Sequence, residues 1–160
     1  MSEQVFLEGE ELMALVRETV AAGQKVRYLP FRGISMLPML RQGRDSVELA
    51  PLPERLKQYD LPVYQLPSGK YVMHRVVEVK GDHYICNGDN LVEMETVYPH
   101  QLVALVSAFT RDGKRVEIDD PRYRAYCRFW CAVRPARHMY RKMKIWLKKQ
   151  IKSVLPRLFT

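Results

Sequence analysis

Residues 71–86 read Tyr-Val-Met-His-Arg-Val-Val-Glu-Val-Lys-Gly-Asp-His-Tyr-Ile-Cys. Two runs rich in β-branched and aromatic residues lie on either side of Lys80-Gly81-Asp82, a sequence typical of a tight turn. This pattern predicts an antiparallel hairpin whose first strand covers Tyr71–Val79. The centre of the chain is therefore expected to be an antiparallel β-sheet.

Shorter runs of the same kind, separated by Pro and Gly, lie before and after this hairpin. They predict strands at Val26–Pro30, Ser46–Leu49, Val63–Leu66, His83–Cys86 and Leu102–Thr110, and a second hairpin over Phe109–Ile118. Ahead of them, apolar residues at helical spacing predict a helix between Glu8 and Gly23. The expected fold class is mainly β, with a short N-terminal helix.

The last quarter of the chain has a different character. Residues 121–160 contain 12 Lys and Arg and no Asp or Glu, whereas residues 1–120 contain 14 basic and 18 acidic residues. Apolar residues at helical spacing on both sides of Pro135 predict an amphipathic helix that this proline interrupts. We therefore expect a β domain over residues 1–120 and a basic helical tail over residues 121–160.

Length and composition limit the class of protein. The 160 residues suffice for one domain, and 47% hydrophobic residues exclude a disordered chain. No run of 18 apolar residues exists, and Met1–Glu11 carries four Glu where a secretory signal would be basic and apolar. Cys86, Cys127 and Cys131 form no CxxC pair, which favours neither disulfides nor a zinc site. We expect a cytoplasmic protein without metal or cofactor.

A serine follows the first expected strand in an unusual setting. Ser35 lies between Gly33 and Pro38 in the sequence Gly-Ile-Ser-Met-Leu-Pro. A serine on such a bend can present its hydroxyl outward, and the glycine would let a substrate carbonyl approach the backbone N–H groups. The alternative is a turn serine that caps residues 37–40.

A histidine and two acids could act together with this serine. Strand alternation puts His74 on one face with Val72 and Val76, either as a buried structural histidine or as a base. Asp89 follows the returning strand of the hairpin and should leave the sheet near the level of His74, although Gly-Asp-Asn is also an ordinary turn sequence. Glu95 is a second acid that could serve instead.

Taken in order, three segments resemble the signal peptidase and SOS-repressor peptidase superfamily over about residues 24–110. They are the serine box with Gly33, Ser35, Met36 and Pro38, the dipeptide His74-Arg75, and the Gly88-Asp89-Asn90 segment. The resemblance implies a peptidase with a β core. Because position 74 is His, it is closest to the type that replaces the more common catalytic Lys by His.

The resemblance also implies roles for individual residues. Ser35 would be the nucleophile, His74 its base and Asp89 the acid that orients the imidazole, with Glu95 as the alternative acid. Lys70, on the same strand face as His74, is an alternative base. Gly33, Ile34, Met36 and Pro38 would form the loop that holds the oxyanion and the substrate.

These observations predict a serine endopeptidase that cleaves a leader, precursor or membrane-proximal peptide bond, with a peptide or protein as its substrate. The alternative is a non-catalytic peptide-binding or membrane-tethering module on the same fold. The basic residues of the tail favour binding to an anionic surface at the inner face of the membrane, and the alternative is that the tail helix packs on the core. Nucleic acid is an unlikely partner, because the first 120 residues are acidic and no binding motif is present.

Overall fold

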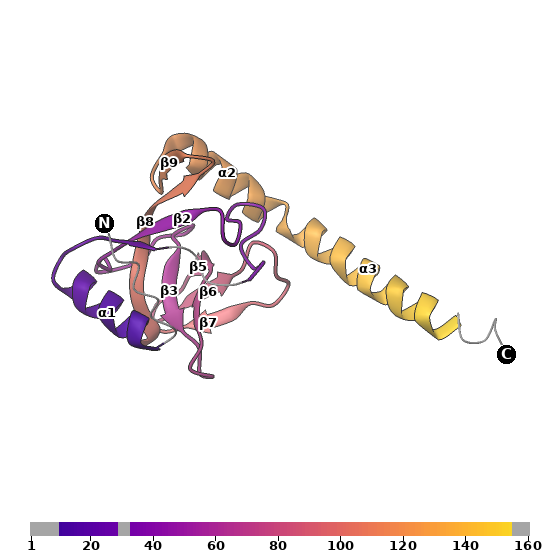
Figure 1. The fold of residues 1–160 in the computed structure, drawn as a ribbon. Helices are drawn as coiled ribbons and strands as arrows, with labels where there is room; N and C mark the ends of the chain where they lie inside the picture. The colour runs from indigo at the N-terminus through magenta and orange to yellow at the C-terminus, as the bar shows by residue number, and fades with distance from the viewer. Residues whose placement is uncertain (1–9, 29–32, 155–160) are drawn as a thin grey trace.

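The computed structural model describes residues 10–28 and 33–154. These residues form two antiparallel sheets and three α-helices (Figure 1). The antiparallel sheets are as expected. Strands make up 30% of the described residues and helices 32%, so the fold mixes antiparallel sheets with helices, and the expected mainly β class is confirmed only in part. The reason is that the tail forms long continuous helices, whereas most strands are short.

The larger sheet has six strands, in the order β1-β2-β8-β3-β4 with β9 beside β8. Their bounds are β1 Val26–Tyr28, β2 Ser46–Ala50, β3 Pro62–Gln65, β4 Tyr71–Met73, β8 Leu102–Arg111 and β9 Lys114–Glu117. Strand β8 is the longest and pairs with β2, β3 and β9. The predicted hairpin between β8 and β9 is confirmed, and Asp112 and Gly113 at its turn both have positive φ.

The smaller sheet has three strands, β5 (Arg75–Val79), β6 (Tyr84–Asn87) and β7 (Glu95–Val97), in that order. The predicted hairpin is confirmed by the pairing of β5 with β6. The single strand expected over Tyr71–Val79 is wrong, because the chain passes at His74 from the larger sheet into the smaller one. Two cores require this step: Met73 packs in the first, and Val76 packs in the second.

Helix α1 (Glu10–Ala21) confirms the predicted N-terminal helix and buries Met13, Val16 and Val20 in the larger core. A 3-10 helix, Pro99–Gln101, precedes β8. The tail forms α2 (Pro121–Ala132) and α3 (Arg134–Val154), the second of which extends away from both sheets (Figure 1).

The break in the tail lies at Val133, between the two helices, and not at Pro135 as expected. Pro135 lies in the first turn of α3, where a residue without an N–H is tolerated because that group would have no partner within the helix. At the other end of the tail, Asp120 begins α2 by accepting hydrogen bonds from the N–H groups of Arg122 and Tyr123. Part of the expected tail, residues 155–160, lies outside the described residues.

A fully buried arginine, Arg75, joins four parts of the fold. Its Nε and Nη2 atoms donate to the two carboxylate oxygens of Asp89 at 2.9 and 2.7 Å. Its Nη1 atom donates to the Tyr123 hydroxyl and the Cys127 sulfur of α2, each at 2.9 Å. Its Nη2 atom also lies 3.0 Å from the sulfur of Met39. The guanidinium therefore fixes β5, the segment after β6, the segment after Ser35 and the first tail helix together.

We predict that Asp89→Asn lowers the free energy of unfolding by about 3–5 kcal/mol, because it leaves the Arg75 charge buried without its counter-ion. Urea denaturation would measure the loss. The matched control is Asp82→Asn, which removes an exposed carboxylate beside His83 and should leave the unfolding midpoint nearly unchanged. Equal midpoints for the two variants would contradict the structural role of the buried pair.

Candidate active site

His74 lies at the junction of β4 and β5 and is only 3% exposed. Its Nδ1 atom is 2.7 Å from Oε2 of Glu95 in β7. The hydroxyl of Tyr64, in β3, donates to the same carboxylate oxygen and lies 3.2 Å from Nδ1. An ionised carboxylate only accepts hydrogen bonds, so the ring donates from Nδ1 and Nε2 is left as its acceptor. An imidazole held in this tautomer can take a proton from a nucleophile.

The environment keeps Glu95 charged. Burial acts to raise the pKa of the Glu95 carboxyl, but the hydrogen bonds from His74 and Tyr64 outweigh it and lower the pKa. Burial also raises the pKa of the Tyr64 hydroxyl far above its ordinary value, so this group stays protonated and acts as a donor. Cys86 pairs with Glu95 across β6 and β7, and burial raises its pKa to about 12, so its sulfur stays a thiol.

The expected contact between Asp89 and His74 is not formed, and Glu95 takes that place. Asp89 instead binds Arg75 with both carboxylate oxygens. The reason is strand alternation: His74 and Arg75 are consecutive, so their side chains point to opposite sides, and Asp89 lies on the side of Arg75. The two acids proposed from the sequence thus have separate positions, one beside the imidazole and one in the buried ion pair.

Ser35 is fastened to the segment that follows β6. Its carbonyl oxygen accepts a hydrogen bond of 2.7 Å from the N–H of Asn90. Gly88 is required for this approach, because a Cβ at position 88 would lie 3.0 Å from the same oxygen and 2.9 Å from the Leu91 side chain. Asn87, just before Gly88, pairs with Arg75, next to His74. The serine segment and His74 are therefore both joined to the end of the smaller sheet at which β5 begins and β6 ends.

The turn around Ser35 is held by backbone hydrogen bonds from Leu37 N–H to the Ile34 carbonyl and from Leu40 N–H to the Met36 carbonyl. The half-buried Ser35 hydroxyl makes no hydrogen bond with another described residue, whether to cap this turn or to reach His74. The alternative of a capping serine is therefore not seen in residues 33–40.

The other residues of the serine loop have different surroundings. Met36 is buried in the larger core, whereas Gly33, Ile34 and Pro38 are exposed. Gly33 has a φ of 143°, and its N–H donates to the Gln42 side chain at 2.9 Å. That N–H is therefore occupied. An oxyanion site in this loop would rest on the N–H groups of Ser35 and Met36, which donate to no other described residue.

Lys70, the alternative base, lies at the turn between β3 and β4, where its carbonyl accepts a hydrogen bond from Leu66 N–H at 2.8 Å. Its side chain is exposed, whereas His74 is buried. Four residues of extended chain separate the two, or about 13 Å at roughly 3.3 Å per residue. The structure therefore does not bring Lys70 to the histidine.

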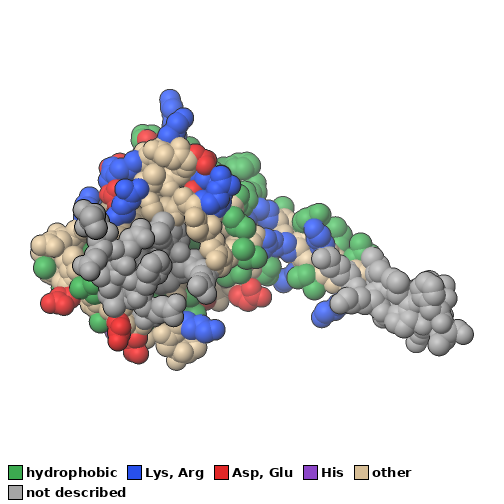
Figure 2. All heavy atoms as spheres, in the orientation of Figure 1, with side chains coloured by type: hydrophobic (Ala, Val, Ile, Leu, Met, Phe, Trp, Pro, Cys, Tyr) green, Lys and Arg blue, Asp and Glu red, His purple; other side chains and the backbone are tan. Residues whose placement is uncertain are grey.

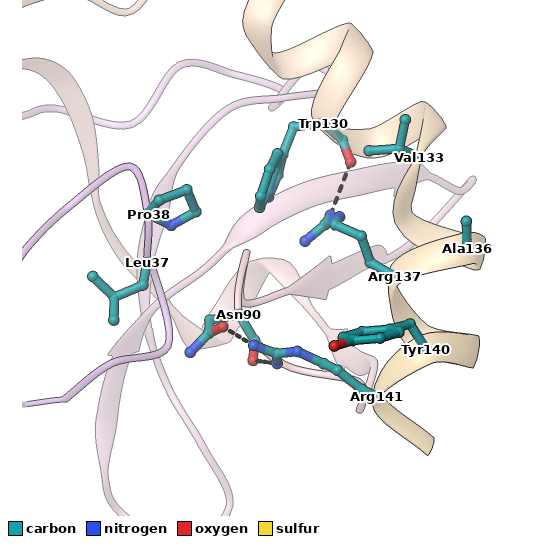
Figure 3. Close-up of a pocket in the computed structure, with 9 residues that line it drawn as sticks. All are labelled: Leu37, Pro38, Asn90, Trp130, Val133, Ala136, Arg137, Tyr140 and Arg141. Atoms are coloured by element: carbon teal, nitrogen blue, oxygen red, sulfur yellow. Dashed lines mark hydrogen bonds between the residues drawn. The ribbon is translucent and has the colours of Figure 1, made fainter. Parts of the chain in front are cut away.

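A cavity of about 520 Å³ lies beside the serine loop (Figure 3). Leu37, Pro38 and Asn90 line one side of it, and α2 and α3 line the other. The tail residues that line it are Trp130, Val133, Ala136, Arg137, Tyr140 and Arg141. Sequence reasoning did not include this wall in the site, because it assigned the tail to a segment separate from the β domain.

The start of α3 is bound to the segment that carries Asp89. Arg137 donates to the Asp89 carbonyl at 2.7 Å and lies over the Trp130 ring, 3.7 Å from its centroid. Arg141 donates to the backbone and side-chain oxygens of Asn90 (Figure 3). The start of α3 therefore packs on the core, and Arg137 and Arg141 donate to backbone and amide oxygens rather than to acidic side chains.

Comparison of the chain with known protein families, with curated proteins and with solved structures finds no match. Within residues 10–28 and 33–154, no group of three or more His, Cys, Asp and Glu side chains is arranged to hold a metal ion. The chemistry that this site can perform must therefore be inferred from the side chains themselves.

We predict that Glu95→Gln destabilises the fold by about 1–2 kcal/mol at pH 7, since it weakens charge-assisted hydrogen bonds at a partly exposed carboxylate. The lowered pKa of Glu95 gives the sign of the pH dependence. The stabilisation is complete above the ordinary Glu pKa of about 4.3 and is lost as the pH falls through the lowered folded-state value. Urea unfolding of wild type and Glu95→Gln would show that their difference in free energy of unfolding is smaller in acid than at pH 7. A difference that does not change with pH would contradict the prediction.

Proposed function

We propose that the protein is a serine endopeptidase in which Ser35 is the nucleophile, His74 the general base and Glu95 the acid that orients the imidazole. One observation carries the proposal. A buried imidazole has its Nδ1 atom 2.7 Å from the Glu95 carboxylate, at the end of the sheet to which the Ser35 loop is fastened. The motifs that resemble the signal peptidase and SOS-repressor superfamily support the same roles for Ser35 and His74.

The proposed reaction uses these groups in turn. Nε2 of His74 takes the Ser35 proton while Oγ attacks the carbonyl carbon of the substrate. The N–H groups of Ser35 and Met36 are the donors nearest in sequence to stabilise the oxyanion that forms. The imidazolium is paired with the charged Glu95 and then gives its proton to the leaving amine. A water molecule, activated by the same imidazole, hydrolyses the acyl-enzyme and restores the Ser35 hydroxyl.

The Ser35 hydroxyl must reach the His74 ring when substrate binds. Catalytic hydrogen bonds are often long or unmade without substrate and tighten in the reacting complex. Ser35 is half-buried on a turn with no competing side-chain hydrogen bond among the described residues, so rotation about its Cα–Cβ bond costs little. The neighbouring cavity offers an open, largely apolar surface for the residues beside the scissile bond.

The substrate that we propose is a leader, a precursor or a membrane-proximal segment of a protein. We place the enzyme in the cytoplasm, because Cys86, Cys127 and Cys131 are free thiols. We place it at the inner face of a membrane because residues 121–160 are basic. Among the described residues, no helix has the length and hydropathy needed to cross a bilayer.

A second candidate is a non-catalytic peptide-binding or membrane-tethering module with the same fold. The observation that favours it is the missing hydrogen bond between the Ser35 hydroxyl and the His74 ring. Covalent labelling distinguishes the two candidates without knowledge of the substrate, because a fluorophosphonate phosphonylates only a serine that a base activates.

We predict that a fluorophosphonate labels the wild-type protein and that Ser35→Ala abolishes the labelling. The matched control is Ser68→Ala, which removes an exposed serine from the turn between β3 and β4 and should leave the labelling unchanged. Intact-mass spectrometry would count the adducts, and circular dichroism would confirm that both variants fold. Equal labelling of Ser35→Ala and wild type, or no labelling of either, would contradict the peptidase assignment.

The identity of the base gives a further prediction. His74→Ala should slow fluorophosphonate labelling by about 10²–10⁴-fold, which is the usual contribution of a positioned general base. Lys70→Met should label at the wild-type rate, because the Lys70 side chain is exposed and distant from the junction that holds His74. The reverse result, with loss only in Lys70→Met, would make the lysine the base.

A further inference from the structure

From Met139 onward, α3 presents a row of exposed apolar side chains. Arg141 still binds Asn90, and the helix then continues away from both sheets to Val154 (Figure 1). Met139, Met143, Trp146 and Leu147 are 71%, 58%, 59% and 51% exposed. We call these four residues the distal stripe. Large apolar side chains that are exposed together in this way indicate an interaction surface.

The four residues share one side of the helix. At about 100° per residue, Met139, Met143, Trp146 and Leu147 fall within an arc of about 100°. Ile145 is 54% exposed but falls on the opposite side. The distal stripe is therefore a continuous surface. Ile145 is also a large exposed apolar residue of α3, but it lies outside the distal stripe.

The charge of α3 identifies the occupant of this surface. The helix contains eight Lys and Arg and no Asp or Glu. At about 100° per residue, Lys142 and Lys149 lie beside one edge of the distal stripe and Lys144 lies beside the other. Basic and apolar side chains are interspersed along the projecting helix (Figure 2). A second copy of the chain would bring like charges together. A bilayer with anionic headgroups matches both the charges and the apolar side chains.

We propose that α3 from Met139 onward lies in the plane of an anionic bilayer, with the distal stripe in the headgroup and acyl boundary and the flanking lysines on lipid phosphates. This inference does not depend on catalysis. Tyr140, in the wall of the cavity beside the serine loop, lies one helical turn before Met143 of the distal stripe. Ala136, in the same wall, lies one turn before Tyr140. Membrane binding would therefore hold the mouth of that cavity at the lipid surface.

The test is flotation with vesicles of phosphatidylglycerol and phosphatidylcholine, or of phosphatidylcholine alone, at low and high salt. Wild type should float with the anionic vesicles only, and less at high salt. Trp146→Glu should weaken binding by about tenfold or more, since it puts a charge into the embedded face. Ile145→Glu introduces the same charge on the other side of the helix, so its binding to the anionic vesicles should stay close to that of wild type.

Three results would overturn the proposal: no binding by wild type, equal weakening by both substitutions, or a dimer in solution that Trp146→Glu dissociates. The first result excludes the bilayer as the partner. The second shows that the helix is attracted by charge but that the distal stripe does not enter the bilayer, and the third assigns the distal stripe to a second copy of the chain. Fluorophosphonate labelling of both variants keeps this outcome separate from the peptidase assignment, since neither Trp146 nor Ile145 lines the cavity beside the serine loop, and labelling should not change.

Discussion

The arrangement of the site depends on the buried ion pair between Arg75 and Asp89. A guanidinium withdrawn from water is stable only if it is neutralised and its donors find acceptors. Arg75 meets both conditions with Asp89, with the tail helix α2 and with the sulfur of Met39. Each of these partners belongs to a different segment, so a single charge fixes the distances among them. The serine loop, the segment after β6 and the basic tail are thereby held around the end of the smaller sheet.

The step between the two sheets gives this ion pair its relation to the candidate catalytic residues. His74 and Arg75 are neighbours in sequence, and their side chains go to opposite sides of the chain. On one side, His74 meets Glu95 and the Tyr64 hydroxyl. On the other, Arg75 meets Asp89. Two carboxylates thus have two functions: one sets the tautomer of the imidazole, and the other neutralises the residue that organises the loops. The surroundings of each acid in the fold decide which of these functions it has, and its distance from His74 along the sequence does not.

Much of the fold could be predicted from local sequence. Both hairpins have turn residues between strand-like arms, and the first helix has a regular apolar face. Strand β7 could not be predicted, because Glu95–Val97 is too short to show a pattern. The choice of Glu95 over Asp89 also escaped prediction, because it depends on pairing among three strands and on the side to which each acid points. The packing of the tail on the core was the less favoured alternative from the sequence, for a related reason: Arg137 and Arg141 bind oxygens of residues 89 and 90, chiefly backbone carbonyls, and such acceptors leave little signature in a sequence.

A crystal structure of the protein after treatment with a fluorophosphonate would show whether the Ser35 hydroxyl and the His74 imidazole form one reactive pair. We expect phosphorus on Ser35 Oγ, His74 Nε2 within hydrogen-bond distance of the adduct at about 3 Å, and Nδ1 still bonded to Glu95. An adduct on another residue, or an imidazole that remains more than about 6 Å from the modified serine, beyond direct or single-water reach, would contradict this pairing.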